Sequence, residues 1–254
     1  MRALVLLTPV ALTLALAPQA AYPCSQVLQL GPTQPGDGAI DVPLNAALYI
    51  HAPGIAGWGI VVEAGDDAGR MSRSEAVPLG ADLARAPLEL AAGRVVSLDV
   101  STPQMGSVRH SLRLRVGSRE DRTPPTPFAT PTLSIRDQGI NPCTNAGWQI
   151  LTVTFMPPTD DYGLAAYTLE VIREGGAQII AHTLFGLDAA DPINAVTLSA
   201  SVPPNEGGCY RVVAHDLAGN TTASPEVCTG AVPPPPPLDA GPPLDTGVRA
   251  DAGS

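Results

Sequence analysis

The fold is decided by residues 209–228, which read Cys-Tyr-Arg-Val-Val-Ala-His-Asp-Leu-Ala-Gly-Asn-Thr-Thr-Ala-Ser-Pro-Glu-Val-Cys. Two apolar runs flank a Gly-Asn turn, a pattern typical of a β-hairpin. Cys209 and Cys228 lie at equal distances from the turn at Ala218 and Gly219. If the strands pair about that turn, the two thiols lie opposite each other, as a disulfide requires.

Strand-like runs continue upstream of this hairpin. Residues 148–155 alternate, with Leu151, Val153 and Phe155 on one face, as a half-buried strand requires. Further runs lie at residues 165–172, 178–184 and 195–200. With the hairpin, the count reaches six or seven strands, which is the number in an Ig-like sandwich.

A second group of short apolar runs lies in the first half of the chain. Residues 111–116 alternate cleanly, with Leu112, Leu114 and Val116 on one face. Other predicted strands lie at residues 46–51, 58–63 and 95–100. The chain has 25 glycines, 28 prolines and only 4% aromatic residues, a balance that favours short strands joined by turns. We therefore expect an all-β protein with two β-sandwiches in tandem.

Composition changes mark the expected boundaries. Residues 1–21 have the charged, apolar and small-residue order of a secretory signal peptide. We expect sandwiches at 24–120 and 124–231, joined through 121–127 by a polar, proline-stiffened linker that holds them apart. Residues 232–254 begin with a run of prolines and continue with Asp-x-Gly steps, which predicts a disordered tail.

Charge and motif content argue against several functions. A net charge of -10 disfavours binding to nucleic acid or to anionic lipid. The sequence has no Gly-x-Ser-x-Gly elbow, His-Glu-x-x-His pair, Walker loop or dinucleotide fingerprint. Its four histidines stand singly in or beside predicted strands. We therefore expect neither an enzyme nor a cofactor.

Cysteine content agrees with export. Four cysteines without a Cys-x-x-Cys pair, in a chain with a signal peptide, indicate disulfides rather than a zinc site. Cys24 follows the apolar segment closely, as in a lipoprotein. Tyr22 and Pro23 are not the small residues that lipidation requires, so we expect cleavage without lipidation and no membrane insertion afterwards.

Three stretches in the second half resemble a bacterial fibronectin type III domain over residues 123–229. They are Thr123-Pro-Pro-Thr-Pro, the loop from Pro158 to Tyr167, and the run from Tyr210 to Asn220. In the first half, Pro35-Gly-Asp-Gly-Ala and Val42-Pro-Leu-Asn resemble the opening of bacterial Ig-like domains of the S-layer type. The whole is similar to secreted myxobacterial proteins.

The resemblance implies a non-catalytic spacer, adhesion or protein-binding module, secreted or at the cell surface, with the periplasm as another location. Its partner would be a protein or an envelope polysaccharide. An accessory carbohydrate-binding module is the alternative, and a row of exposed aromatic rings would be its signature. Trp148 and Tyr167 are expected in the sandwich core instead.

The same resemblance implies which polar residues and thiols come together. It places Asp160 and Asp161 at the same pole as Asp216, so these are calcium candidates. Local turn chemistry is the preferred interpretation, and no metal site is predicted. It also brings Cys143 near Cys209 and Cys228. Cys209 with Cys228 is the preferred disulfide, and Cys143 with Cys228 is the rival.

Overall fold

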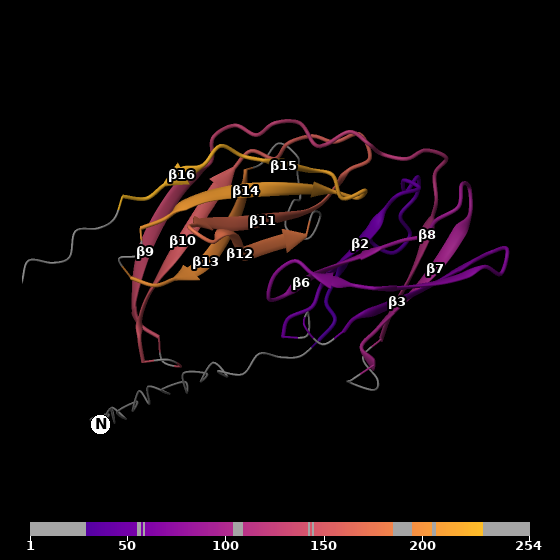
Figure 1. Ribbon diagram of the computed structural model, residues 1–254, viewed down its shortest axis with the longest axis horizontal. Helices are drawn as coiled ribbons and strands as arrows, with labels where there is room; N and C mark the ends of the chain where they lie inside the picture. Colours follow the sequence, from indigo (N-terminus) through magenta and orange to yellow (C-terminus); the bar gives the residue numbers. More distant parts are fainter. Residues whose placement is uncertain are drawn as a thin grey trace, which may run out of the picture.

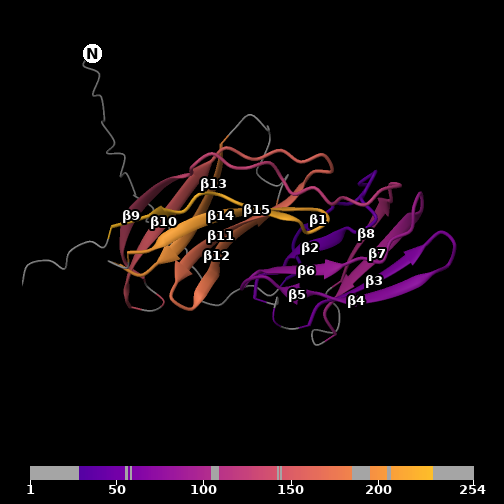
Figure 2. The same cartoon turned by 45° about the horizontal axis from the view of Figure 1, so that its top comes forward.

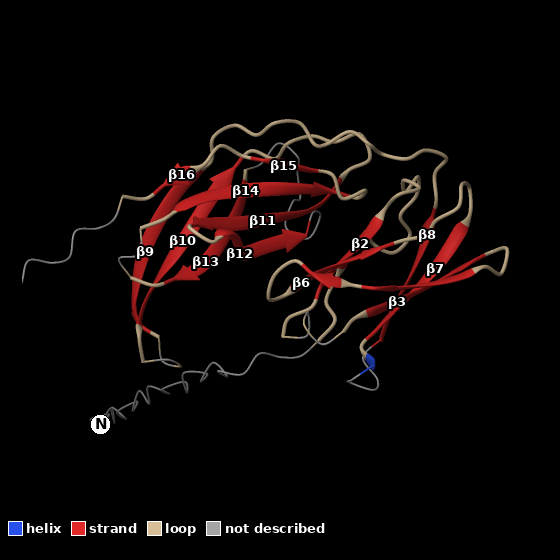
Figure 3. Cartoon of the chain, in the orientation of Figure 1, coloured by secondary structure: helices blue, strands red, loops and turns tan. Residues whose placement is uncertain are grey.

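The computed structural model describes residues 29–54, 57, 59–103, 109–141, 143, 145–184, 195–204 and 207–230. In these residues the chain consists almost entirely of antiparallel strands and loops (Figure 3). No helix in the described ranges is long and apolar enough to cross a membrane. The predicted signal peptide at 1–21, Cys24 and the predicted tail at 232–254 lie outside the described residues.

The first sandwich is drawn from indigo to magenta in Figure 1. Its strands are β1 (Thr33–Gln34), β2 (Ala47–His51), β3 (Val61–Asp66), β4 (Met71–Glu75), β5 (Val77–Pro78), β6 (Leu83–Pro87), β7 (Val95–Ser101) and β8 (Arg109–Arg115). One sheet has the order β1-β2-β6-β5 and the other β4-β3-β7-β8. Leu48, Ile50, Leu98 and Leu114 lie in the core between them. Val42, from the Ig-like motif, forms a parallel bridge with Val116.

The second sandwich follows. Its strands are β9 (Thr132–Ile140), β10 (Gly147–Phe155), β11 (Leu164–Arg173), β12 (Gly176–Leu184), β13 (Val196–Val202), β14 (Cys209–Asp216), β15 (Thr221–Ala223) and β16 (Val227–Cys228). One sheet has the order β13-β10-β9, and the other has β12-β11-β14-β15, with β16 also paired to β14. This two-sheet antiparallel arrangement is that of an Ig-like or fibronectin type III-like sandwich.

The predicted alternation and hairpin are confirmed. Leu151, Val153 and Phe155 of β10 are buried in the core of the second sandwich. In the hairpin, β14 pairs antiparallel with β15 and β16, and Cys209 is in register with Cys228. Strand β9 was missed from the sequence, because most of its side chains are exposed and it has no apolar alternation.

Two strands, β2 and β11, depart from the alternation of buried and exposed residues. Consecutive residues are buried along β2 and along β11, so both faces of these strands are covered. One face of each belongs to its own sandwich core. The other face contacts the neighbouring sandwich, where β2 and β6 lie beside β11, β12 and β14 (Figure 2).

The expectation that the linker holds the two units apart is therefore wrong. Seven buried residues from both sandwiches form one apolar cluster. We call the region where the sandwiches meet the joint. Proline stiffness at 124–127 does not keep the units separate, because the linker runs along the joint and is hydrogen-bonded to both sandwiches at Asp121.

Candidate functional site at the joint

The joint is built from the outer faces of two sheets. Its buried apolar residues are Ala47, Tyr49 and Leu83 from the first sandwich and Ala165, Ala166, Leu184 and Leu217 from the second. The three alanines leave room for the backbones to approach closely, and the amide of Ala47 donates to the carbonyl oxygen of Leu217 at 2.7 Å. A strand-like hydrogen bond thus crosses between the sandwiches.

Aromatic and cationic side chains extend this contact. The rings of Tyr49 and His215 lie 5.9 Å apart, edge to face. The guanidinium of Arg85 lies 5.8 Å from the centroid of the Tyr49 ring, within the range of a cation–π interaction. Burial raises the pKa of Tyr49 to about 12. The phenol therefore stays neutral at physiological pH.

Two of the four histidines are held neutral at the joint. Burial, followed by the positive charge of Arg85, lowers the pKa of His215 to about 4. His182 lies 5.1 Å from His51 of the first sandwich. Burial and then His51 lower the pKa of His182 to about 4, against an opposing effect of Asp82. In the sequence each histidine stands alone beside a strand, whereas the tertiary structure brings His182 to His51 and His215 to Tyr49.

The linker residue Asp121 is fixed between the sandwiches. Its amide donates to Oδ1 of Asn45 at 2.9 Å, and its carbonyl oxygen accepts from Nδ2 of Asn45 at 2.7 Å. From the other side, Nδ2 of Asn220 donates to the same carbonyl oxygen at 3.4 Å. The asparagine of the Ig-like motif and the asparagine of the hairpin turn therefore hold the linker between them.

An acidic cluster lies where the linker passes the second sandwich. Asp121, Asp160 and Asp216 each offer a carboxylate oxygen, and these oxygens lie within 4.8 Å of one another. Asp160 and Asp216 were sequence candidates, and the structure brings them together. Asp161 is not part of this cluster. Asp121 was missed because its approach to the other two depends on the path of the linker.

The three carboxyl groups differ in their hydrogen bonds. Both oxygens of Asp216 accept from Asn220, one from the amide at 2.8 Å and one from the side chain at 2.8 Å. Oδ1 of Asp160 accepts from the amide of Tyr162 at 2.9 Å. Oδ1 of Asp121 accepts from the amide of Thr123 at 3.0 Å. These are the turn bonds that the sequence favoured.

The close approach of these acids disfavours ionisation of Asp160 and Asp216. Burial raises the pKa of Asp160, and the negative charges of Asp121 and Asp216 raise it further. Burial also raises the pKa of Asp216, with a contribution from Asp121 that opposes the hydrogen bonds of Asn220. A bound cation or proton would relieve this repulsion.

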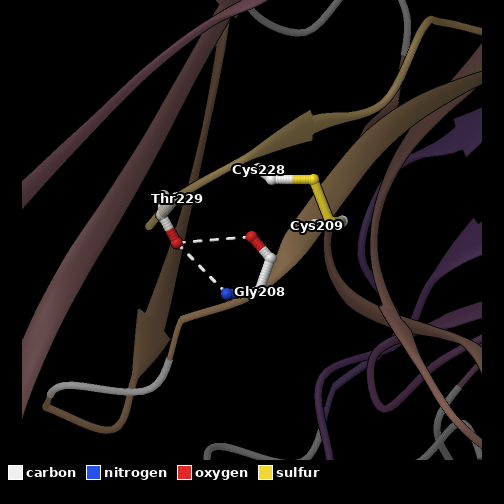
Figure 4. Close-up of a disulfide and its surroundings, with 4 residues drawn as sticks. All are labelled: Gly208, Cys209, Cys228 and Thr229. Atoms are coloured by element: carbon white, nitrogen blue, oxygen red, sulfur yellow. Dashed lines mark hydrogen bonds between the residues drawn. A yellow bond between two sulfur atoms is a disulfide. The ribbon is translucent and has the colours of Figure 1, made fainter. Parts of the chain in front are cut away.

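The disulfide between Cys209 and Cys228 is present (Figure 4). Next to it, Oγ1 of Thr229 accepts from the amide of Gly208 at 3.1 Å, which ties the same strand ends together. The rival bond between Cys143 and Cys228 is not formed, and Cys143 is itself disulfide-bonded. In-register pairing of β14 with β16 decides the choice.

Tyr167 is buried in the second core, as predicted. Its ring packs edge to face on Phe155 at 5.0 Å and on Phe128 at 6.5 Å. Trp148 is only half-buried and lies outside this core cluster, next to a register shift in β10. The expectation that Trp148 is a core residue is therefore wrong.

Comparisons with known proteins give no family. No family model matches the chain, and no curated protein matches it. Solved structures similar to it include the BSP domain of a biofilm-associated protein, at 10% identity and a TM-score of 0.27, covering 81% of this chain and 30% of that chain. A two-domain fibronectin type III segment from chicken tenascin is similar at 12% identity and a TM-score of 0.22, covering 80% and 95% of the two chains.

A third similar structure is the N-terminal Ig1-2 module of the Drosophila receptor protein tyrosine phosphatase DLAR. The identity is 12% and the TM-score 0.22, covering 80% of this chain and 96% of that chain. The fold assignment itself rests on the strand order of the two sandwiches.

Proposed function

We propose that this chain is an exported, non-catalytic module whose two sandwiches act as one rigid body, serving as a spacer, adhesion or protein-binding element outside the cell. The joint carries this proposal. Contacts between domains normally leave relative motion unless the interface is apolar. Here Tyr49 and Leu83 are fully buried against the second sandwich.

Two further observations support an extracellular setting. Residues 1–21 have the order of a signal peptide. The disulfide between Cys209 and Cys228 belongs to an oxidising compartment.

No observation favours the carbohydrate-binding alternative. No aromatic ring is among the large apolar side chains exposed on the described surface, which are Ile40, Met71, Val77, Ile135, Ile140 and Met156. A polysaccharide site of the expected kind would present aromatic rings. We therefore propose a protein or an envelope component as partner, contacted through loops at the poles of the sandwiches.

Export is tested by expressing the full chain in a bacterial host and analysing its N-terminus by mass spectrometry. We expect an exported protein cleaved after the region of residues 1–21, without lipid on Cys24. An uncleaved chain retained in the cytoplasm would contradict export. Lipid on Cys24 would convert the proposal to a tethered protein.

Rigidity is tested by small-angle X-ray scattering of the purified protein. One rigid body predicts a single compact arrangement that fits the scattering curve, with the same dimensions at low and high ionic strength. An ensemble of separated sandwiches would contradict the proposal. A pull-down with cell-envelope fractions, using the isolated protein as bait, then searches for the partner.

A further inference from the structure

Three chain segments bring one carboxylate each to the same point of the joint. Asp121 comes from the linker, Asp160 from the loop before β11 and Asp216 from the end of β14. No ion pair among the described residues neutralises any of them. Three carboxylates so close together repel one another, and a bound cation would relieve that repulsion.

The carboxylate of Asp121 gives a second, independent observation. The residue is 2% exposed, and its Oδ2 atom is buried without a hydrogen-bond partner. Its Oδ1 atom is already used by the amide of Thr123. A buried carboxylate oxygen without a donor is costly, and such oxygens in native proteins are normally bound to something.

We propose that Asp121, Asp160 and Asp216 bind a calcium ion at the joint. Calcium takes oxygen ligands at about 2.3–2.6 Å, so two oxygens on one ion are separated by up to about 5 Å. The spread of 4.8 Å or less among these carboxylate oxygens fits that sphere. Magnesium requires a smaller and stricter octahedron, and zinc prefers nitrogen and sulfur ligands.

The cluster is open to solvent on one side. Asp121 and Asp216 are buried, whereas Asp160 is half-buried and opens the cluster to solvent. Water molecules entering on the Asp160 side complete the six to eight ligands that calcium takes. A site with three protein carboxylates and several waters belongs to the weak, extracellular range of affinities, with Kd about 10⁻⁴–10⁻³ M.

The ion would connect parts of the chain that the joint already brings together. Asp121 is bound through its backbone to Asn45 of the first sandwich. Asp160 and Asp216 belong to the second sandwich. Calcium therefore tightens the joint. The inference goes beyond the proposed spacer function and does not depend on it, since binding is measured without reference to export or partner.

The test uses the full chain after treatment with EDTA. Calcium chloride is titrated into the protein in a calorimeter, and the melting temperature is measured in 0 and 10 mM calcium, with magnesium in parallel. We expect one calcium per chain, weaker binding of magnesium, and a higher melting temperature in calcium. Absence of saturable calcium binding up to 10 mM would overturn the proposal and leave the spacer function intact.

Asp160→Asn is the diagnostic variant because the residue is half-buried and the substitution keeps its shape. We expect at least tenfold weaker calcium binding. Asp161→Asn is the matched control, since it removes the same charge from the neighbouring exposed residue outside the cluster. We expect its affinity to stay within twofold of wild type. Equal losses in both variants would show nonspecific attraction and overturn the site.

Asp121→Asn supplies a second readout. In EDTA it removes one of three repelling charges, so we expect a melting temperature at or above that of wild type. In 10 mM calcium we expect it below wild type, because a ligand is lost. If the variant is less stable than wild type by the same margin in both conditions, Asp121 has only a structural role and the proposal fails.

Discussion

The Nη2 atom of Arg85, in the first sandwich, donates a hydrogen bond of 3.1 Å to the carbonyl oxygen of Ala218, in the hairpin turn of the second. The next residue, Gly219, has φ of 90°. A Cβ added at Gly219 would overlap Nη2 of Arg85. The hairpin turn is therefore a structural part of the joint, and glycine at 219 permits the arginine to reach it.

Gly219→Ala is expected to lower the free energy of unfolding by about 2 kcal/mol. About half comes from alanine in a left-handed conformation. The rest comes from displacement of Arg85, which loses its bond to Ala218. Chemical denaturation measures the change.

Gly69→Ala is the matched control for that substitution. Gly69 has φ of 79°, and nothing lies within 4 Å of its added Cβ. We expect a loss of about 1 kcal/mol there. In an Arg85→Ala background, Gly219→Ala should cost no more than Gly69→Ala. An unchanged cost in that background would show that the arginine contact contributes nothing.

The hairpin follows from residues close in sequence, whereas the contacts of the joint join residues far apart in the chain. Pairing of β14 with β15 and β16 depends on residues close in sequence, so the Gly-Asn turn and the cysteine spacing predict it. The joint depends on contacts such as that between Tyr49 and His215, far apart in the chain. Composition at 121–127 favoured separation, yet Asp121 is almost fully buried.

One sequence signal for the joint existed in β2 and β11. Strands covered on both faces have continuous apolar runs rather than alternation. Residues 46–50 form such a run, and residues 164–167 form a shorter one before the strand alternates. Each pairs small alanines with large apolar residues, which is what a face shared with a second sandwich requires. For the acidic cluster, only Asp160 and Asp216 could be inferred, because the position of Asp121 follows from the joint.

Leu83→Ala tests whether the joint couples the sandwiches. Leu83 is fully buried in the joint cluster, so truncation is expected to cost about 2–4 kcal/mol. The amide of Ala47 donates to Leu217 across the joint. We expect its hydrogen exchange, followed by NMR, to become faster because the joint opens more often.

Leu98→Ala provides the comparison for Leu83→Ala. Leu98 is equally buried but lies in the core of the first sandwich. A similar loss of stability is expected. If the joint can open without unfolding of the first sandwich, hydrogen exchange at the amide of Ala47 should be accelerated less by Leu98→Ala than by Leu83→Ala. If both variants accelerate the Ala47 amide equally, the sandwiches open only by global unfolding.

Because the pKa of His215 is lowered in the folded state, we expect this residue to reduce the free energy of unfolding on acidification. Its pKa is lowered to about 4 in the folded state, below the ordinary value of 6.5. Its contribution to stability is therefore fully present above pH 6.5, and is lost as the pH falls towards about 4, because the unfolded chain binds the proton first. His182 acts in the same direction, whereas Asp160 and Asp216, with raised pKa values, act in the opposite one.

His215→Gln separates these contributions. The variant retains a polar group for Oγ1 of Thr168, which lies 3.1 Å from Nε2 of His215. Between pH 6.5 and 5, in EDTA, we expect the slope of unfolding free energy against pH to decrease by up to about 1.4 kcal/mol per pH unit. An unchanged slope in His215→Gln would mean that this histidine is protonated equally in both states.

The cysteine pair of the hairpin gives a prediction for chemistry and for stability. The chain has arginine but no lysine, so trypsin cleaves after Arg173, Arg211 and Arg249 and separates Cys209 from Cys228. Without reduction, we expect peptides 174–211 and 212–249 to be joined, whereas a peptide 137–173 joined to 212–249 would contradict the bond.

The two cysteines of the disulfide are 19 residues apart, so replacing both by serine is expected to lower the free energy of unfolding by about 3 kcal/mol. Thr229→Val, which removes the two side-chain hydrogen bonds to Gly208 beside the disulfide, should cost about 1 kcal/mol. Equal losses in the two variants would mean that strand pairing, and not the covalent bond, stabilises this end of the sandwich.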